Sequence, residues 1–292
     1  MIRAAILVLL LWAPAASAAG PALLLDAEIP WTEPEASFGG FSGLAVTDDG
    51  RSFVTVSDKG TWATGRMERE HGRLTGITMT GHGPLHEISG TPLDGLNVDA
   101  EGLDLDPQGR AYVSFEAFHR VRRYDHLDGP AASVPPHPDF ARLQNNSGLE
   151  ALTIDAEGTL YVIPERSGAL DRPFPVYRFR NGRWDKDLRL RRDGEFLVVD
   201  ADFGPDGRLY VLERSFRWLG GFATRIRRFT LGPEGLGDEI TLFETRIGEM
   251  DNMEGMSVWR DEAGQTRVTL LSDDNFFALQ RTIIAEFVLA ER

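Results

Sequence analysis

Residues 99–116, DAEGLDLDPQGRAYVSFE, have the pattern of a β-hairpin that turns at a glycine. Leu103 and Leu105 alternate with polar residues up to an Asp-Pro-Gln-Gly turn, after which Tyr112 and Val113 lead the chain back. Two-residue periodicity on both sides of such a turn is a strong hairpin pattern. The stretch therefore predicts a pair of antiparallel strands.

Related hairpins occur throughout the chain, at residues 41–58, 147–166, 198–214 and, with a longer turn, 252–275. Their turn glycines are Gly50, Gly109, Gly158, Gly207 and Gly264. These glycines recur roughly every 50 to 60 residues, in the range of propeller blades. Aromatic and β-branched hairpins at this spacing favour a β-propeller over a solenoid. The predicted fold class is all-β, as a single β-propeller.

The ends of the chain predict how the ring closes. The apolar segment 22–29 stands alone before the first hairpin, and residues 282–289 leave the last blade one strand short. The N-terminal strand would complete that blade, because ring closure removes exposed sheet edges. The count favours five blades, and a sixth, degenerate blade within residues 72–97 is the alternative.

Residues 1–18 are predicted to be a signal peptide, which leaves residues 19–292 as the propeller domain. Arg3 is followed by an apolar run and by the small residues Ala16-Ser17-Ala18, as at a cleavage site. An uncleaved N-terminal anchor is the alternative. The 292 residues include no cysteine, so we expect a periplasmic or secreted monomer without disulfides.

The charge limits the partners. A formal net charge of −14 and a pI near 4.9 argue against nucleic acid and anionic membranes. Surface carboxylates also confer solubility, so the charge alone does not indicate cation binding. The expected partner is a small anionic or ester substrate.

One mouth of the central channel is the predicted site. The first strand of each blade lines the channel, and Glu101, Glu150 and Glu254 open three of these strands. The residues that close the second strands should join them, because the two ends of a hairpin lie side by side. These residues are Ser57, Asp58, Lys59, Glu116, Glu165, Arg166, Glu213, Arg214, Asp273, Asp274 and Asn275, with Asp99, Asn146, Asp200, Asp202 and Asn252 at the border.

Acids packed around an axis repel one another, so their pKa values rise unless a cation compensates them. Oxygen ligands without cysteine or histidine select a hard ion such as Ca²⁺. The predicted metal ligands are Glu101, Glu150, Glu254, Asp273, Asp58 and Asp200. Lys59, Arg166 and Arg214 could pair with these acids or bind the negative charge of a substrate. In the structural alternative, the repeated Glu-Gly pairs accept backbone N–H groups and form tight bends.

Other catalytic patterns are weak. The absence of Gly-x-Ser-x-Gly disfavours a serine esterase of the α/β-hydrolase type. None of the six histidines has metal-ligand spacing, and His119 alone stands beside a hairpin end as a candidate general base.

The segments NVDAEGLDLDPQGRAYVSFE (97–116), NSGLEALTIDAEGTLYVIPERS (146–167) and DNMEGMSVW…LLSDDNF, with TIIAEFVL downstream, resemble a known family. This is the phytase-like family described as having esterase-like activity, secreted bacterial propeller proteins. The resemblance extends from about residue 23 onward and implies hydrolysis of phosphoesters or other esters, but assigns no catalytic residue. A weaker resemblance is to calcium-dependent gluconolactonase-type propellers, in which Glu, Asn and Asp hold the metal. Glu101, Asn146 and Asp200 are the nearest matches, although their surroundings depart from that pattern.

The sequence is therefore compatible with three functions. The preferred one is metal-assisted hydrolysis of a phosphoester or ester, with Glu101, Glu150 and Glu254 as catalytic residues and Lys59, Arg166 and Arg214 binding substrate. The second is lactone hydrolysis at the same metal. The third is a propeller that binds a ligand without turnover.

Overall fold

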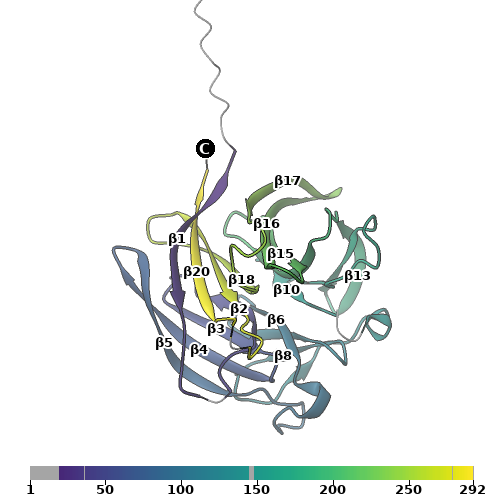
Figure 1. The fold of residues 1–292 in the computed structure, drawn as a ribbon. Helices are drawn as coiled ribbons and strands as arrows, with labels where there is room; N and C mark the ends of the chain where they lie inside the picture. Colours follow the sequence, from purple (N-terminus) through teal and green to yellow (C-terminus); the bar gives the residue numbers. More distant parts are fainter. Residues whose placement is uncertain (1–19, 36, 145–147, 278, 292) are drawn as a thin grey trace, which may run out of the picture.

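The computed structural model describes residues 20–291 except 36, 145–147 and 278. The expected signal peptide lies outside these residues. Five four-stranded antiparallel sheets are arranged in a ring around a central axis (Figure 1). Helix is confined to the short 3-10 turns η1 (Gly95–Asn97) and η2 (Phe140–Arg142) in the part of the chain described. No helix among these residues is long and apolar enough to cross a membrane.

Blades one to four run outward from the channel in chain order. Blade one comprises β2 (Phe41–Val46), β3 (Ser52–Ser57), β4 (Thr61–Glu70) and β5 (Arg73–Pro84). Blade two comprises β6 (Ala100–Leu105), β7 (Ala111–Phe115), β8 (Arg120–Tyr124) and β9 (Ala132–Ser133). Blade three comprises β10 (Ala151–Ile154), β11 (Leu160–Ile163), β12 (Phe174–Arg180) and β13 (Arg183–Leu190). Blade four comprises β14 (Leu197–Phe203), β15 (Leu209–Arg217), β16 (Gly221–Gly232) and β17 (Gly235–Glu244).

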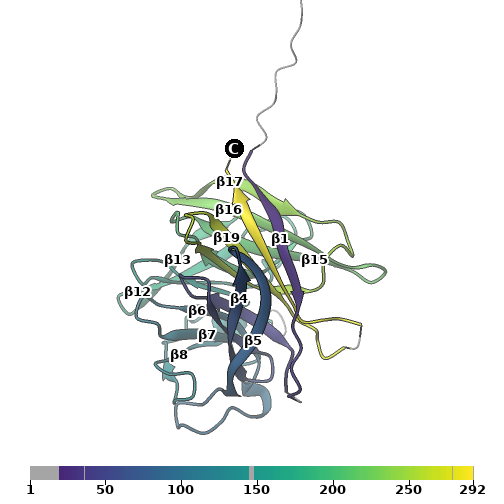
Figure 2. The ribbon, with the colours of Figure 1, turned by 90° about the vertical axis from the view of Figure 1, so that its left-hand side faces the viewer.

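Blade five confirms the predicted closure. It comprises β18 (Met253–Arg260), β19 (Thr266–Ser272), β20 (Ile283–Ala290) and the N-terminal strand β1 (Ala22–Pro30). Strand β1 pairs antiparallel with β20, the last strand of the chain. The two chain ends thus join one sheet (Figure 2). The alternative of a sixth blade is wrong, because β5 is the outer strand of blade one and pairs with β4. Residues 85–97 contain only η1, loop and an isolated β-bridge between His86 and Pro92.

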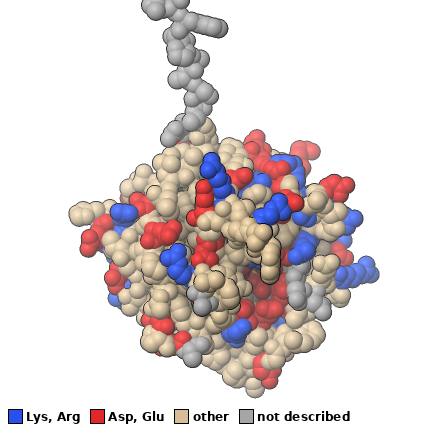
Figure 3. Space-filling model, in the orientation of Figure 1, with Lys and Arg blue, Asp and Glu red and all other residues tan. Residues whose placement is uncertain are grey.

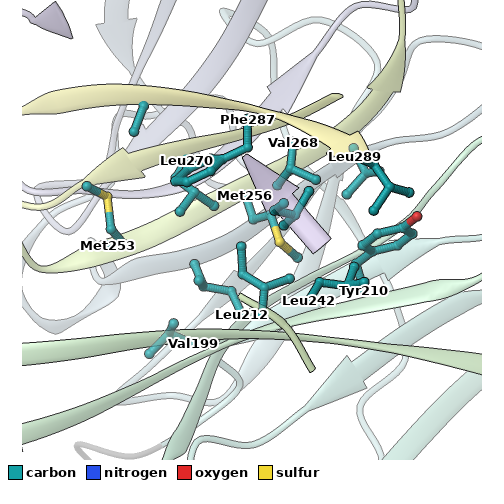
Figure 4. Close-up of a cluster of buried hydrophobic side chains, with 14 of the residues drawn as sticks. Val199, Tyr210, Leu212, Leu242, Met253, Met256, Val268, Leu270, Phe287 and Leu289 are labelled. Carbon is teal, nitrogen blue, oxygen red and sulfur yellow. The ribbon is translucent and has the colours of Figure 1, made fainter. Parts of the chain in front are cut away.

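The hydrophobic core lies between neighbouring blades. Separate clusters of buried side chains occur at each of the interfaces between neighbours in the ring. Figure 4 shows the cluster between blades four and five, where Tyr210 and Leu212 face Met256 and Phe287. Each blade therefore buries its apolar faces against its neighbours, which joins the blades into one domain.

Glycines allow the inner strands to approach one another closely. A Cβ at Gly102 would lie 2.5 Å from the carbonyl oxygen of Glu150 in the next blade. Gly43 is similarly close to Leu103, and Gly255 to Leu44. None of these glycines has a positive φ. In the Glu101-Gly102 and Glu254-Gly255 pairs, the glycine therefore provides space for the neighbouring blade without adopting a positive φ.

Substitution of Gly102 should be costly for this reason. We expect Gly102→Ala to lower the free energy of unfolding by about 3 kcal/mol, because the added methyl group forces two inner strands apart. Gly237→Ala is the matched control, since Gly237 has a negative φ and no atom near its ideal Cβ. Urea unfolding of both variants measures the difference, and equal stabilities would contradict the close-packing explanation.

Side chains also cap the channel edge of the inner strands. At equivalent positions, a side-chain oxygen accepts a backbone N–H from the next blade. The pairs are Asp104 with Ile154 (2.7 Å), Thr153 with Phe203 (3.2 Å), Asp202 with Val258 (2.6 Å) and Ser257 with Val46 (3.0 Å). Burial raises the pKa of Asp104 to about 7. These polar residues satisfy N–H groups at the channel edge that have no strand partner.

Candidate acidic site at the channel mouth

The ends of each hairpin meet on one face of the disc. In blade two, the N–H of Glu116, just after β7, donates to the carbonyl of Asp99, just before β6, at 2.9 Å. The same bond joins Asp58 to Gly40, Glu165 to Gly148 and Asp273 to Asn252 in blades one, three and five. The acids that open and close these hairpins therefore lie at one mouth of the channel.

β-Bulges occur where the inner strands reach this mouth. The pairing of β6 with β7 shifts between Ala100 and Leu103, and that of β18 with β19 shifts between Met253 and Gly255. Glu101 and Glu254 lie within these shifts. A bulge re-aims its side chain out of the regular alternation of the strand. The bulges thus explain how glutamates on inner strands come to face the mouth.

Asp99, Glu101 and Glu116 form the tightest acidic cluster among the described residues. Each offers a carboxylate oxygen, and these oxygens all lie within 4.8 Å of one another. Desolvation, followed by the charges of Asp99 and Glu116, raises the pKa of Glu101 well above its usual value. Two oxygens bound to one Ca²⁺ at about 2.4 Å are at most about 4.8 Å apart. The donor set and its spacing therefore fit a hard divalent cation.

Glu150 extends this cluster into blade three. Its pKa is raised well above the usual value by desolvation and then by the charges of Glu101, Glu165 and Glu116. Glu116 itself accepts an N–H from Gly148, two residues before Glu150, at 2.5 Å. Glu150 thus borders the three-carboxylate cluster and remains protonated at a higher pH than an exposed glutamate.

Arg214 is the main counter-charge of the mouth. It extends from β15 and forms ion pairs with Glu254 of blade five and, at 3.6 Å, with Glu165 of blade three. It also donates to Asn252 at 2.9 Å, and Asn252 donates to Glu254 at 2.7 Å. Blade four has no glutamate equivalent to Glu101. It contributes instead a guanidinium that links the acids of the blades on both sides.

A second acidic group lies between blades five and one. Burial and the charges of Asp58 and Asp274 raise the pKa of Asp273 to about 7, while the N–H of Asn275 lowers it. Burial also raises the pKa of Asp58, against the opposing effect of Lys59. Lys59 lies 3.4 Å from Asp58, with its ammonium group 4.6 Å from the centre of the Phe276 ring. Lys59 is therefore at the mouth, where the sequence placed it.

Several predicted residues have other contacts. Asp200 accepts the N–H of Ala201 at 2.8 Å and of Met256 at 2.6 Å, so its two oxygens join inner strands. Arg166 is half exposed and pairs with Glu165 at 3.2 Å. Asn146 lies outside the described residues. Of the gluconolactonase-like set, Glu101 alone is seen in the acidic cluster.

Glu213 and His119 are also engaged in contacts that give them no part in the acidic cluster of the mouth. Glu213 is buried and forms ion pairs with Arg225 at 2.8 Å and Arg227 at 2.5 Å. The alternating arginines of TRIRRF, on the adjacent strand, could have indicated this pairing. Burial lowers the pKa of His119, which packs against Gly148.

The sequence prediction placed Asp99 and Glu116 near the site but did not select them as ligands. Their position could have been inferred from the hairpin itself, because the residues that open and close it are paired. Acidic side chains gather in a hollow on the face of the disc seen in Figure 3. This hollow coincides with the centre of the ring in Figure 1. The mouth is thus an acidic depression in which Arg214 links acids of blades three and five.

A comparison with protein families matches residues 36–276 to the phytase-like family described as "Esterase-like activity of phytase". The chain belongs to this family. The match includes all the acids of the mouth, from Asp58 to Asp274. A search of curated protein sequences finds no match.

Solved structures similar to this phytase-like chain include a protein of unknown function from Dyadobacter fermentans DSM 18053, at 13% identity and a TM-score of 0.47, covering 90% of this chain and 79% of that one. A glucose dehydrogenase has 11% identity and a TM-score of 0.44, with 90% and 98% covered. A luciferin-regenerating enzyme has 12% identity and a TM-score of 0.43, with 92% and 95% covered.

Proposed function

We propose that the channel mouth is a Ca²⁺-dependent hydrolytic site for a phosphoester or another ester. The single observation that carries this proposal is the cluster of Asp99, Glu101 and Glu116, whose oxygens are spaced to share one cation. Membership of the phytase-like family supports ester hydrolysis as the reaction.

The three carboxylates of the cluster would hold the cation, and Glu150 stands beside them. A bound divalent cation would polarise the ester and lower the pKa of a bound water molecule. Ligands that are acidic and partly desolvated repel one another, so they favour binding of a cation over remaining empty.

Glu150 is the best-placed general base. Its raised pKa makes its carboxylate a stronger base than that of an exposed glutamate. In the proposed step, the oxygen of water forms a bond to the carbonyl carbon or phosphorus, and the ester C–O or P–O bond breaks. The proton of water passes to Glu150 and then to the departing alcohol oxygen. Glu254, paired with Arg214, positions this guanidinium and takes no part in the proton transfer.

A substrate panel tests the function. Protein stripped with EGTA should bind Ca²⁺ in isothermal titration calorimetry and hydrolyse p-nitrophenyl phosphate or p-nitrophenyl acetate only after Ca²⁺ is added. Full turnover after exhaustive chelation would remove the metal from the mechanism. Opening of gluconolactone without release of p-nitrophenol would support the lactonase, and Ca²⁺ binding with no turnover would support a binding propeller.

A further inference from the structure

An apolar groove of about 880 Å³ lies between two connections on the mouth face. One wall is the end of the β15–β16 hairpin, with Phe216 of β15, Trp218 of the connection and Phe222 of β16. The other wall is the β19–β20 connection with Phe277 and Leu279. Both connections project on the same side of the disc (Figure 2). We call this space the aromatic groove.

The aromatic groove is held in shape by backbone and ring contacts. Phe216 and Phe222 pack with their ring centres 5.0 Å apart. Phe222 also forms a β-bridge to Met250, and its carbonyl accepts the N–H of Gly248 at 2.7 Å. The β15–β16 connection is therefore tied to the segment that enters β18.

Large apolar side chains nevertheless remain exposed there. Trp218 is 88% exposed and Leu279 is 82% exposed, with Phe216 and Phe277 about half exposed. Isolated exposed apolar residues are common, but several that line one groove indicate a ligand or partner. Ligand sites are typically concave and apolar, with volumes of about 300–1,000 Å³. The volume and lining thus suit a small molecule.

The aromatic groove adjoins the acidic mouth. The guanidinium carbon of Arg214 lies 6.0 Å from the ring centre of Phe222. Met253, which lines the groove, immediately precedes Glu254. On the other wall, the N–H of Asn275 donates to Asp273 at 2.7 Å. The groove therefore borders Glu254 and Asp273, the blade-five carboxylates of the mouth.

We propose that the aromatic groove binds an apolar acyl or aryl arm of an ester whose scissile bond lies at the acidic mouth. The inference rests on the proposed hydrolytic function and specifies its substrate class. Three acids, Glu28, Glu249 and Asp251, line the groove together with one basic residue, Arg281, so its lining is net negative and would repel a polyanionic substrate. An uncharged apolar arm avoids that repulsion and buries the exposed aromatic surface.

Other occupants fit less well. An anionic membrane would be repelled by these acids and by the net charge of −14. A second copy of the chain would bring the same acidic rim against itself. The uncharged apolar arm of a substrate can enter the groove without bringing further negative charge toward these acids.

The test is a series of p-nitrophenyl esters from acetate to octanoate with the wild type, Trp218→Ser and Trp218→Ser/Phe277→Ser. Phe118→Ser is the matched control, because Phe118 is an exposed aromatic residue, at 57%, on the β7–β8 connection of the same face. In the wild type, kcat/KM should rise roughly fourfold for each methylene that is buried, which corresponds to ~0.8 kcal/mol. The double variant should lose this rise but hydrolyse the acetate at the wild-type rate.

Binding of the uncharged probe N-phenyl-1-naphthylamine gives a readout that does not need turnover. The double variant should bind the probe at least about tenfold more weakly than the wild type or Phe118→Ser, since two aromatic contacts are lost. If the probe binds as expected but no ester is hydrolysed, the proposed function fails while the groove stands as an apolar ligand site. The proposed role of the groove would be overturned if kcat/KM of the wild type did not change with acyl chain length and the double variant bound the probe as tightly as the wild type. Dimerisation in sedimentation velocity that Trp218→Ser abolishes would also overturn it, by assigning this surface to a second copy.

Discussion

Glu101→Gln should nearly abolish ester hydrolysis while making the metal-free protein more stable above neutral pH. Glu101 belongs to the cluster that would hold the cation, so its loss should lower kcat/KM by at least about 100-fold, because the cation that would polarise the ester and activate the water is bound less tightly. Glu150→Gln should have a similar effect on rate, with Ca²⁺ affinity less affected. Hydrolysis rates and calorimetric Ca²⁺ titrations measure both effects.

The stability change follows from the direction of the pKa shift. The folded protein raises the pKa of Glu101, so it binds more protons than the unfolded chain between the ordinary pKa of a glutamate and the raised value. The free energy of unfolding of the metal-free wild type should therefore fall as pH rises through this window. Glutamine does not ionise, so the free energy of unfolding of Glu101→Gln should decrease less with rising pH than that of the wild type. Urea unfolding in EGTA at pH 5 and pH 8 measures it.

Glu157→Gln is the control for a change of one charge. Glu157 is exposed at the turn of the blade-three hairpin, on the face away from the mouth. Glu157→Gln should leave activity, Ca²⁺ affinity and the pH dependence of stability at wild-type values. Glu101→Gln with wild-type Ca²⁺ affinity would show that the cation site lies elsewhere.

The propeller was predictable from sequence because its signals are local and repeated. Each hairpin carries its own alternation and turn glycine, and the recurrence of Gly109 and its equivalents indicates the blades. The unpaired segment 22–29 indicated the closure that β1 makes with β20. The ambiguity in residues 72–97 arose because β5 is a polar outer strand with weak alternation, whose membership of blade one depends on pairing with β4.

The sequence predicted which face of the disc carries the site, but it did not predict the contacts of the individual acids. Hairpin geometry alone places Glu101, Glu150 and Glu116 at one mouth. It does not say which acids are already engaged, because that depends on partners from other blades. Asp200 accepts N–H groups of two strands, and Glu254 is paired with Arg214. These pairings cross blade boundaries and leave no periodic pattern in the sequence.

Arg214→Met is expected to have the largest effect on stability, lowering the free energy of unfolding by about 3–5 kcal/mol, the usual cost of leaving a buried charge without its partner. Glu254 and Glu165 are both buried and would lose this guanidinium. Adding Glu254→Gln should restore part of the loss, and the double-mutant cycle measures the coupling between the two side chains. Arg214→Lys should be intermediate, because an ammonium group cannot reproduce the planar fork.

The same variants distinguish a structural from a substrate-binding Arg214. Its charge lowers the pKa values of Glu101 and Glu150, which desolvation raises, so its removal should increase the affinity of the mouth for Ca²⁺ in protein that remains folded. If Arg214 instead binds substrate, Arg214→Met should raise the KM for p-nitrophenyl phosphate more than the KM for the neutral acetate. Ca²⁺ affinity and stability should then change little. Because Arg214 already contacts Glu254, Glu165 and Asn252, we expect the first pattern. A selective rise in KM for the phosphate in a stable Arg214→Met protein would contradict it.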